Sequence, residues 1–203
     1  MIEAAAKAPL VCLASASPRR RELLHQIGIA HCVAPGDADE AERAGEAPRD
    51  YVLRLARTKA EAMAGDPAAR ALPVLGADTA VILDGVILGK PVDAADARRM
   101  LSLLAGREHE VLSAVALAYR GRCEARLSVS QVRFAPLSAA DIDRYVASGE
   151  PFGKAGGYAI QGLAATFVEH LAGSYSGVMG MPLYETSLLL AGAGIAAQSA
   201  RQL

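Results

Sequence analysis

Residues 10–28 read LVCLASASPRRRELLHQIG, and this stretch predicts the unit with which the fold begins. The apolar residues 10–14 predict a short buried strand. Ser17 is suited to cap a helix, Pro18 to occupy its first position and Gly28 to end it. We therefore expect a strand that leads through a short polar loop into a helix.

Beyond this unit, helical and strand patterns alternate along the chain. Helices are expected at about 50–64, from a cap at Asp93 to Gly106, from a capping box at Ser138 and Asp141 to Gly149, and at 183–191. Strands are expected at 74–83 and 86–88 around the turn Asp84-Gly85, at 110–119 and 123–134 in a long antiparallel hairpin, and at 158–160 and 166–171. These elements predict an α/β fold with a mixed β-sheet, arranged as two lobes with a central cleft.

Composition and charge exclude several classes of function. The 203 residues, 52% of them apolar, suffice for one domain or two small lobes. Lysine and arginine number 21 against 22 acidic residues, so the formal net charge of -1 gives no overall attraction for nucleic acid or an anionic membrane. Any recognition of phosphate must therefore be local.

The cysteines and the apolar runs predict a location in the cytoplasm. Cys12, Cys32 and Cys123 are odd in number and lack metal-type spacing, which argues against a disulfide framework and against structural zinc. The apolar run 188–197 is well short of the roughly 20 residues that span a bilayer. We expect a cytoplasmic protein without a membrane segment.

Three arginines, Arg19, Arg20 and Arg21, occupy the first turn of the first predicted helix. The positive end of the helix dipole disfavours a cation there by several tenths of a kcal/mol, roughly, so an anionic group is expected nearby. Free backbone N–H groups and guanidinium groups together favour phosphate. A solvated basic turn is the alternative.

Lys59 lies at the centre of the apolar face of the helix predicted at 50–64. Its side chain either extends past its neighbours to water or directs its ammonium into a cleft lined by anions. Lys90 follows the predicted hairpin directly and could bring a second ammonium to the same end of the sheet; a surface lysine is equally compatible with the pattern.

Asp78 interrupts the apolar residues 74–81. An unpaired carboxylate buried there would cost several kcal/mol, roughly, so a metal ion or a basic neighbour should accompany it. Such a carboxylate can hold Mg²⁺ beside phosphate oxygens or accept a proton from water. The alternative is a turn-forming Asp between two shorter strands.

Two further segments are ambiguous when taken alone. The acidic residues Asp37, Asp39, Glu40 and Glu42 have the pattern of a solvated loop. Residues 152–162, FGKAGGYAIQG, combine glycines that permit close approach to a ligand with Gln161, whose amide is both donor and acceptor. This segment either reads a base or is an ordinary glycine-rich turn, and residues 173–177 leave the same two alternatives.

Taken together, these segments resemble the Maf family in order and in spacing over residues 10–192. The matching motifs are SASPRR at 15–20, ARTKA at 56–60, GADT at 76–79, KP at 90–91, AGGYAIQG at 155–162 and GSYS at 173–176. The resemblance implies a cytoplasmic, metal-dependent nucleoside triphosphate pyrophosphatase, a single Maf-like domain over residues 1–203 and a homodimer. It also implies an elongated mixed sheet flanked by helices, similar to the inosine-triphosphatase fold.

The resemblance assigns roles to individual residues. Asp78 matches the catalytic proton acceptor, and Glu40 matches an acidic residue that acts with it on a divalent metal ion, Mg²⁺ or Mn²⁺. The positions around the triphosphate are Ser15, Arg20, Lys59 and Lys90. The positions associated with substrate choice are Arg19, Thr79 and Gln161.

These last three residues indicate the branch that hydrolyses dTTP and UTP. The branch that looks specific for 7-methyl-GTP usually has a bulky residue in place of Arg19, Gln in place of Thr79 and Glu in place of Gln161. None of these replacements occurs here. Gly177 departs from the family pattern, because relatives often carry Asn there.

Two alternative functions are a regulatory nucleotide-binding protein linked to inhibition of septum formation and an enzyme that clears non-standard nucleotides. The acidic pair favours hydrolysis over binding alone.

Overall fold

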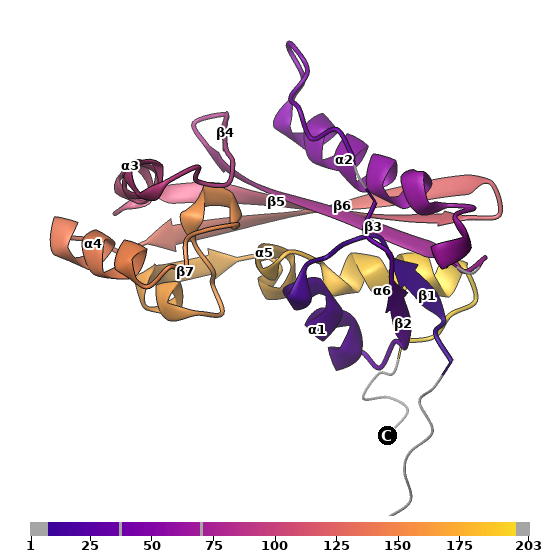
Figure 1. Cartoon of the computed structure of the whole chain (residues 1–203). Coiled ribbons are helices and arrows are strands. Elements are labelled where there is room, and N and C mark those ends of the chain that lie inside the picture. The colour runs from indigo at the N-terminus through magenta and orange to yellow at the C-terminus, as the bar shows by residue number, and fades with distance from the viewer. Residues whose placement is uncertain (1–7, 37, 70, 198–203) are drawn as a thin grey trace, which may run out of the picture.

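A computed structural model of the chain describes residues 8–36, 38–69 and 71–197, and a mixed seven-stranded sheet forms its centre (Figure 1). The strands are β1 (Val11–Leu13), β2 (His31–Val33), β3 (Val74–Leu83), β4 (Val86–Leu88), β5 (Glu108–Tyr119), β6 (Arg122–Phe134) and β7 (Val168–Ala172). Their order is β2-β1-β3-β5-β6-β7, and β4 also pairs with β3. β1 is parallel to β2 and β3, whereas the other neighbours are antiparallel. The predicted mixed sheet is confirmed.

Helices cover both faces of this sheet, as Figure 1 shows. They are α1 (Pro18–Gln26), α2 (Pro48–Met63), α3 (Ala94–Leu104), α4 (Ala139–Ala147), α5 (Tyr175–Met179) and α6 (Leu183–Gly192), with short 3-10 helices η1 (Pro67–Ala69), η2 (Ala155–Gly157) and η3 (Leu163–Phe167). α2 packs on one face, and α1 and α6 pack on the opposite face near β1. α3 and α4 lie at the other end of the long strands.

The buried apolar side chains form separate clusters at the two ends of the sheet. Around β1, one cluster contains Val52 and Ala56 of α2, and another contains Leu23 and Leu24 of α1. The cluster at the far end joins α3 and α4 to β6 and includes Phe134. This division corresponds to the two predicted lobes, which share the strands β3, β5 and β6.

One edge of β3 is open in its middle. β1 pairs with β3 only as far as Leu75, and β4 begins its pairing at Val81. Within the described residues, no strand therefore pairs with residues 76–80 on the side away from β5. Successive side chains alternate between the faces of a strand, so Asp78 projects toward α2 and Thr79 toward the opposite face.

The predicted helix caps are largely confirmed. The side chain of Asp93 accepts a hydrogen bond from the backbone of Asp96, and Ser138 and Asp141 form the reciprocal capping box. Ser17 occupies the N-cap of α1 without a capping hydrogen bond from its side chain. Its backbone N–H instead donates to Oγ of Ser15 at 3.2 Å, which folds the loop before the helix.

The strand predicted at 158–160 is wrong. These residues follow η2 as a buried loop, because the ring of Tyr158 packs edge-on against Phe134 and the N–H of Ala159 donates to Oη of Tyr145 at 3.3 Å rather than to a strand. The strand predicted at 166–171 is shifted and forms β7. Neither β2 nor α5 was predicted. β2 is short and, unlike β1, only partly buried, so it shows no apolar run, and α5 is a single turn without a periodic pattern.

No helix among the described residues is long and apolar enough to cross a membrane.

Gly76 allows α2 to approach the sheet closely. A Cβ atom at this position would lie 2.3 Å from the carbonyl oxygen of Ala56 and 2.5 Å from the backbone nitrogen of Ala60. Both atoms belong to the backbone of α2, so a side-chain rotation cannot relieve the overlap. The residue type at position 76 therefore sets the distance between α2 and β3.

We predict that Gly76→Ala lowers the free energy of unfolding by about 1–3 kcal/mol, because overpacking a close backbone contact forces the helix outward. Gly192→Ala in α6 is the control, since an added Cβ there meets no atom within 4 Å. Urea unfolding of both variants measures the difference. Equal stability of Gly76→Ala and the wild type would show that α2 can shift without cost.

Candidate active site

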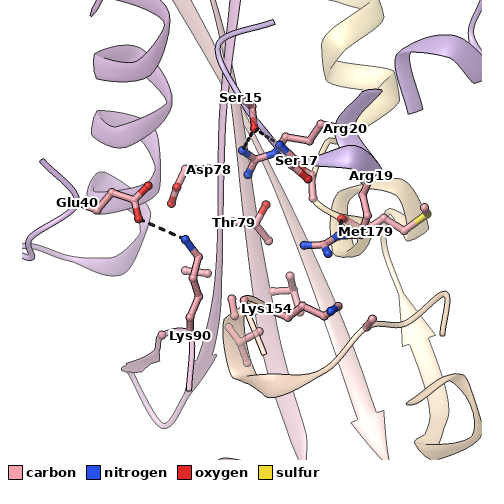
Figure 2. A pocket seen from close by; sticks show the side chains of 18 of the residues that line it. Ser15, Ser17, Arg19, Arg20, Glu40, Asp78, Thr79, Lys90, Lys154 and Met179 are labelled. Carbon is pink, nitrogen blue, oxygen red and sulfur yellow. Dashed lines mark hydrogen bonds and ion pairs between the residues drawn. The ribbon is translucent and has the colours of Figure 1, made fainter. Parts of the chain in front are cut away.

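A cavity of about 680 Å³ opens beside the free edge of β3 and is lined by segments from both lobes (Figure 2). All of the residues that the sequence singles out for substrate or metal line it: Ser15, Arg19, Arg20, Glu40, Lys59, Asp78, Thr79, Lys90 and Gln161. The fold thus brings together residues separated by up to 146 positions in the sequence, from Ser15 to Gln161. Asp37 lies outside the described residues.

Lys59 connects two carboxylates at one wall of the cavity. Its Nζ lies 2.7 Å from Oδ1 of Asp78 and 2.6 Å from Oε1 of Glu40. Only 12% of the lysine side chain is exposed, so the side chain does not extend past its neighbours to water. β3 is continuous through Asp78, which excludes the alternative of a turn between two shorter strands.

The two carboxylates have opposite pKa shifts. Burial raises the pKa of Asp78 above its ordinary value of 3.8, although the nearby charges of Lys59 and Arg20 oppose this rise. Burial also acts to raise the pKa of Glu40, but the hydrogen bond and charge of Lys59 and the charge of Lys90 outweigh it and lower that pKa. Asp78 is therefore a better proton acceptor than an ordinary aspartate, whereas the neighbouring lysines favour the charged form of Glu40.

Lys90 approaches the same pair from the loop after β4. Its Nζ lies 3.5 Å from Oε2 of Glu40, and 60% of its side chain is exposed (Figure 2). This contact is longer and more exposed to solvent than that of Lys59, so the side chain of Lys90 can turn toward a ligand in the cavity.

Two of the three arginines in the first turn of α1 face the cavity. Arg20 donates from Nε to the carbonyl oxygen of Gly180 at 2.9 Å and from Nη1 to Oγ of Ser15 at 3.0 Å. Arg19 donates from Nε to the carbonyl oxygen of Met179 at 3.3 Å, whereas Arg21 is exposed and outside the lining. Burial lowers the pKa of both Arg19 and Arg20.

These two guanidinium groups have no carboxylate within ion-pairing distance among the described residues. Their partners are carbonyl and hydroxyl oxygens, which orient the side chains without neutralising them. The positive charge of the first turn is therefore directed at the cavity, as expected for a phosphate site.

Thr79 lies on the face of β3 opposite Asp78. Its Oγ1 is 2.9 Å from Oγ of Ser113 on β5, which donates to the carbonyl oxygen of Gly177 at 2.5 Å. This chain of hydrogen bonds connects β3 with α5. Gly177 takes part through its backbone, including an N–H that donates to Oγ of Ser174 at 3.0 Å, so its departure from the family pattern removes no charge from the cavity.

The sequence did not single out Tyr51 or Lys154, although both line the cavity. Oη of Tyr51 donates to the backbone oxygen of Glu40 at 3.0 Å and thereby holds the acidic loop. Its position eight residues before Lys59, on the same helix face, was the available signal. Lys154 points into the cavity from the lobe opposite Glu40 (Figure 2), and burial together with the charge of Arg19 lowers its pKa.

The carboxylates at this wall suit a metal ion whose coordination is completed by oxygens of the substrate. Within the described residues, no three His, Cys, Asp or Glu side chains are grouped closely enough to hold a metal by themselves. Asp78 and Glu40 offer two carboxylates, both within reach of one ammonium. Mg²⁺ is commonly bound by one or two carboxylates together with phosphate oxygens, so this pair fits such an ion.

A cavity lined by arginine and lysine side chains, with paired carboxylates at one wall, has the charge distribution expected of an α/β protein that acts on a phosphate-bearing ligand. Residues 10–193 match the family described as Maf-like protein. The chain therefore belongs to the Maf-like family.

The curated relatives of the chain are similar over almost their whole length. A protein of Bordetella parapertussis named dTTP/UTP pyrophosphatase is 57% identical over 199 residues, covering 95% of this chain and 96% of the relative. A protein of Ralstonia nicotianae with the same name is 57% identical over 201 residues, covering 94% and 97%. One from Burkholderia pseudomallei, also with this name, is 54% identical over 204 residues, covering 95% and 98%.

A solved structure shows a weaker likeness. It is a nucleoside-triphosphatase, dITP/XTP pyrophosphatase, from Mycobacterium abscessus, which aligns with 62% of this chain and 74% of its own at a TM-score of 0.41 and 19% identity.

We predict that Asp78→Asn becomes more stable relative to the wild type as the pH rises. Because burial raises the pKa of Asp78 in the folded state, the folded wild type binds this proton more tightly than the unfolded chain. The wild type therefore loses stability as the pH increases from 3.8 through the raised pKa, whereas the amide does not titrate.

Urea unfolding between pH 3 and 8 measures this difference in free energy. Asp143→Asn is the matched control, because the side chain of Asp143 is 59% exposed. A stability difference for Asp78→Asn that stays constant across this range would contradict the assignment of a raised pKa.

Proposed function

We propose that this protein hydrolyses dTTP and UTP to the nucleoside monophosphate and pyrophosphate. The observation that carries the proposal is the carboxylate pair of Asp78 and Glu40 at one wall of a cavity whose other charged lining is mainly cationic. The names of the relatives, which are 54–57% identical over nearly their whole length, support the same activity. A cavity of about 680 Å³ is also within the usual range for small-ligand sites.

The lining suits a triphosphate because its cations come from several directions. Arg19 and Arg20 enter from α1, Lys90 from the loop after β4 and Lys154 from the opposite lobe. A single polyanion can contact cations that would repel one another in its absence. Binding of the phosphates thus offsets the cost of gathering these charges.

In the proposed reaction, Asp78 accepts a proton from a water molecule that attacks the α-phosphorus. A new bond forms between the water oxygen and phosphorus, and the bond from the α-phosphorus to the bridging oxygen breaks, releasing pyrophosphate. The raised pKa of Asp78 makes its carboxylate a better base than an exposed aspartate. Lys59 holds Oδ1 of Asp78 at 2.7 Å and so orients this carboxylate.

Asp78 and Glu40 would also hold a divalent cation, Mg²⁺ or Mn²⁺, together with phosphate oxygens of the substrate. When bound, such a cation neutralises the triphosphate and polarises its oxygens. Arg20, Lys59 and Lys90 would stabilise the charge that develops on the transferred and departing groups, which is the main contribution of protein side chains in phosphoryl chemistry.

The base is assigned to the part of the cavity near Arg19, Thr79 and Gln161. The amide of Gln161 offers one donor and one acceptor, which match a carbonyl and an N–H on the edge of uracil or thymine. A cytoplasmic location remains a prediction from the cysteines, the apolar runs and the family resemblance, and a homodimer remains a prediction from the resemblance.

The test incubates dTTP, UTP, CTP and GTP separately with Mg²⁺ and with Mn²⁺ and quantifies monophosphate, pyrophosphate and orthophosphate. We expect pyrophosphate from dTTP and UTP, and almost none with Asp78→Asn. Release of orthophosphate would contradict attack at the α-phosphorus. Tight binding of the nucleotides without turnover would favour the regulatory alternative.

We predict that Gln161→Glu lowers kcat/KM for dTTP and UTP about tenfold or more and reduces the preference for them over GTP. An ionised glutamate can only accept hydrogen bonds, so a carbonyl of the base is left unmatched at a cost of roughly 1–3 kcal/mol. Gln131→Glu is the control, because it makes the same change on β6, outside the cavity lining.

The four kcat/KM values are measured for both variants and for the wild type. A proportional fall for every nucleotide in Gln161→Glu would indicate damage to the phosphate chemistry, and unchanged values would show that Gln161 does not contact the base.

A further inference from the structure

The turn that carries Gln161 is held from behind by Glu150, which does not itself line the cavity. Glu150 follows α4 and is partly buried beneath residues 159–164. Its Oε2 accepts a hydrogen bond from the backbone N–H of Leu163 at 3.0 Å, and its Oε1 accepts one from the N–H of Ala164 at 3.3 Å. Both donors lie within three residues of Gln161.

Tyr145 of α4 extends this support to the other side of Gln161. Its hydroxyl donates to Oε1 of Glu150 at 2.9 Å and accepts from the N–H of Ala159 at 3.3 Å. Within the turn, the N–H of Gly162 donates to the carbonyl oxygen of Ala159 at 3.0 Å. Gln161 is thus bracketed by backbone groups at 159 and at 163–164 that connect to the same carboxylate, directly or through Tyr145.

The carboxylate also fills the space beside Gly162. A Cβ atom at that position would lie 2.4 Å from Oε2 of Glu150 and 2.5 Å from its Oε1. Because three donors hold the carboxylate, it cannot move aside without losing hydrogen bonds. The turn therefore depends on the carboxylate oxygens at 150 and on the absence of a side chain at 162.

Glu150 has no cationic partner within ion-pairing distance among the described residues. Two backbone amides and one hydroxyl supply its hydrogen bonds instead. Such an arrangement fixes the backbone more precisely than a flexible lysine or arginine would, since the amides belong to the turn itself.

We propose that Glu150 is a positioning residue for base selection: it fixes the 159–164 turn so that the amide of Gln161 is presented to the base. This inference rests on the proposed role of Gln161 in reading a pyrimidine. Glu150 acts only through the turn, so its removal should disturb recognition of the base and spare recognition of the phosphates.

The test compares Glu150→Ala and Glu150→Gln with the wild type, and Glu169→Gln on the exposed strand β7 is the control. We expect Glu150→Ala to lower kcat/KM for UTP about tenfold and to reduce the ratio of UTP to GTP, because two backbone N–H groups lose their acceptor. Glu150→Gln retains one acceptor oxygen and should fall between Glu150→Ala and the wild type. Inhibition by inorganic tripolyphosphate, which has no base, should change less than twofold.

Hydrogen exchange provides a readout that does not depend on turnover. The amides of Leu163 and Ala164 should lose protection in Glu150→Ala, and those of α2 should not. A double-mutant cycle with Gly162→Ala checks the geometry. Alone, Gly162→Ala should lower kcat/KM for UTP, and it should lower this value little further once Glu150→Ala has removed the carboxylate.

The proposed function and this inference fail in different ways. If the wild type does not hydrolyse UTP, the proposed activity is wrong. The ratio of the dissociation constants of the α,β-imido analogues of dUTP and dGTP then replaces the ratio of kcat/KM for UTP to that for GTP. The positioning role is overturned if Glu150→Ala weakens tripolyphosphate inhibition as much as it weakens use of UTP. An unchanged ratio of UTP to GTP, or of the two analogues, in both Glu150 variants would overturn it as well.

Discussion

The ammonium of Lys59 lies between the carboxylates of Asp78 and Glu40, at 2.7 Å and 2.6 Å, and the rest of the site depends on this contact. Without it, Asp78 would be a buried charge with no ion-pair partner within the described residues, at a cost of several kcal/mol, roughly. The contact also ties the loop that carries Glu40 to α2, which holds the same loop through the hydrogen bond from Tyr51. One lysine thus joins a helix, a strand and a loop.

The packing of α2 on β3 makes this contact possible. Gly76 lets the backbone of α2 approach β3 at Ala56 and Ala60, and Lys59 is the neighbour of Ala60. Asp78 is two residues beyond Gly76 and therefore projects from the same face of the strand. In the part of the chain that the structure describes, no strand pairs with residues 76–80 of β3 at this edge, so the carboxylate reaches both the lysine and the open cavity.

Asymmetry between the two sides of the cavity suits a reaction that separates base recognition from phosphate chemistry. The carboxylates and Lys59 lie on the α2 side of β3, whereas Thr79 connects through Ser113 to α5 on the other. The turn at 159–164 lies at the end of the sheet that carries α3 and α4, and it is supported by Glu150, which follows α4. Under the proposed assignment of Gln161, that turn would contact the base, whereas the charged wall would contact the phosphates.

Sequence by itself determined the opening strand and helix and the long hairpin of β5 and β6, because periodicity and caps are local signals. Charges within apolar segments singled out Lys59 and Asp78, whereas the roles of the other cavity residues came from the resemblance to the Maf family. Only the tertiary structure decided that Lys59 pairs with both Asp78 and Glu40, that 158–160 is a loop rather than a strand, and that Glu150 supports the turn of Gln161. Each of these features depends on contacts between segments that are separated along the chain, and such contacts produce no periodic pattern in the sequence of either segment.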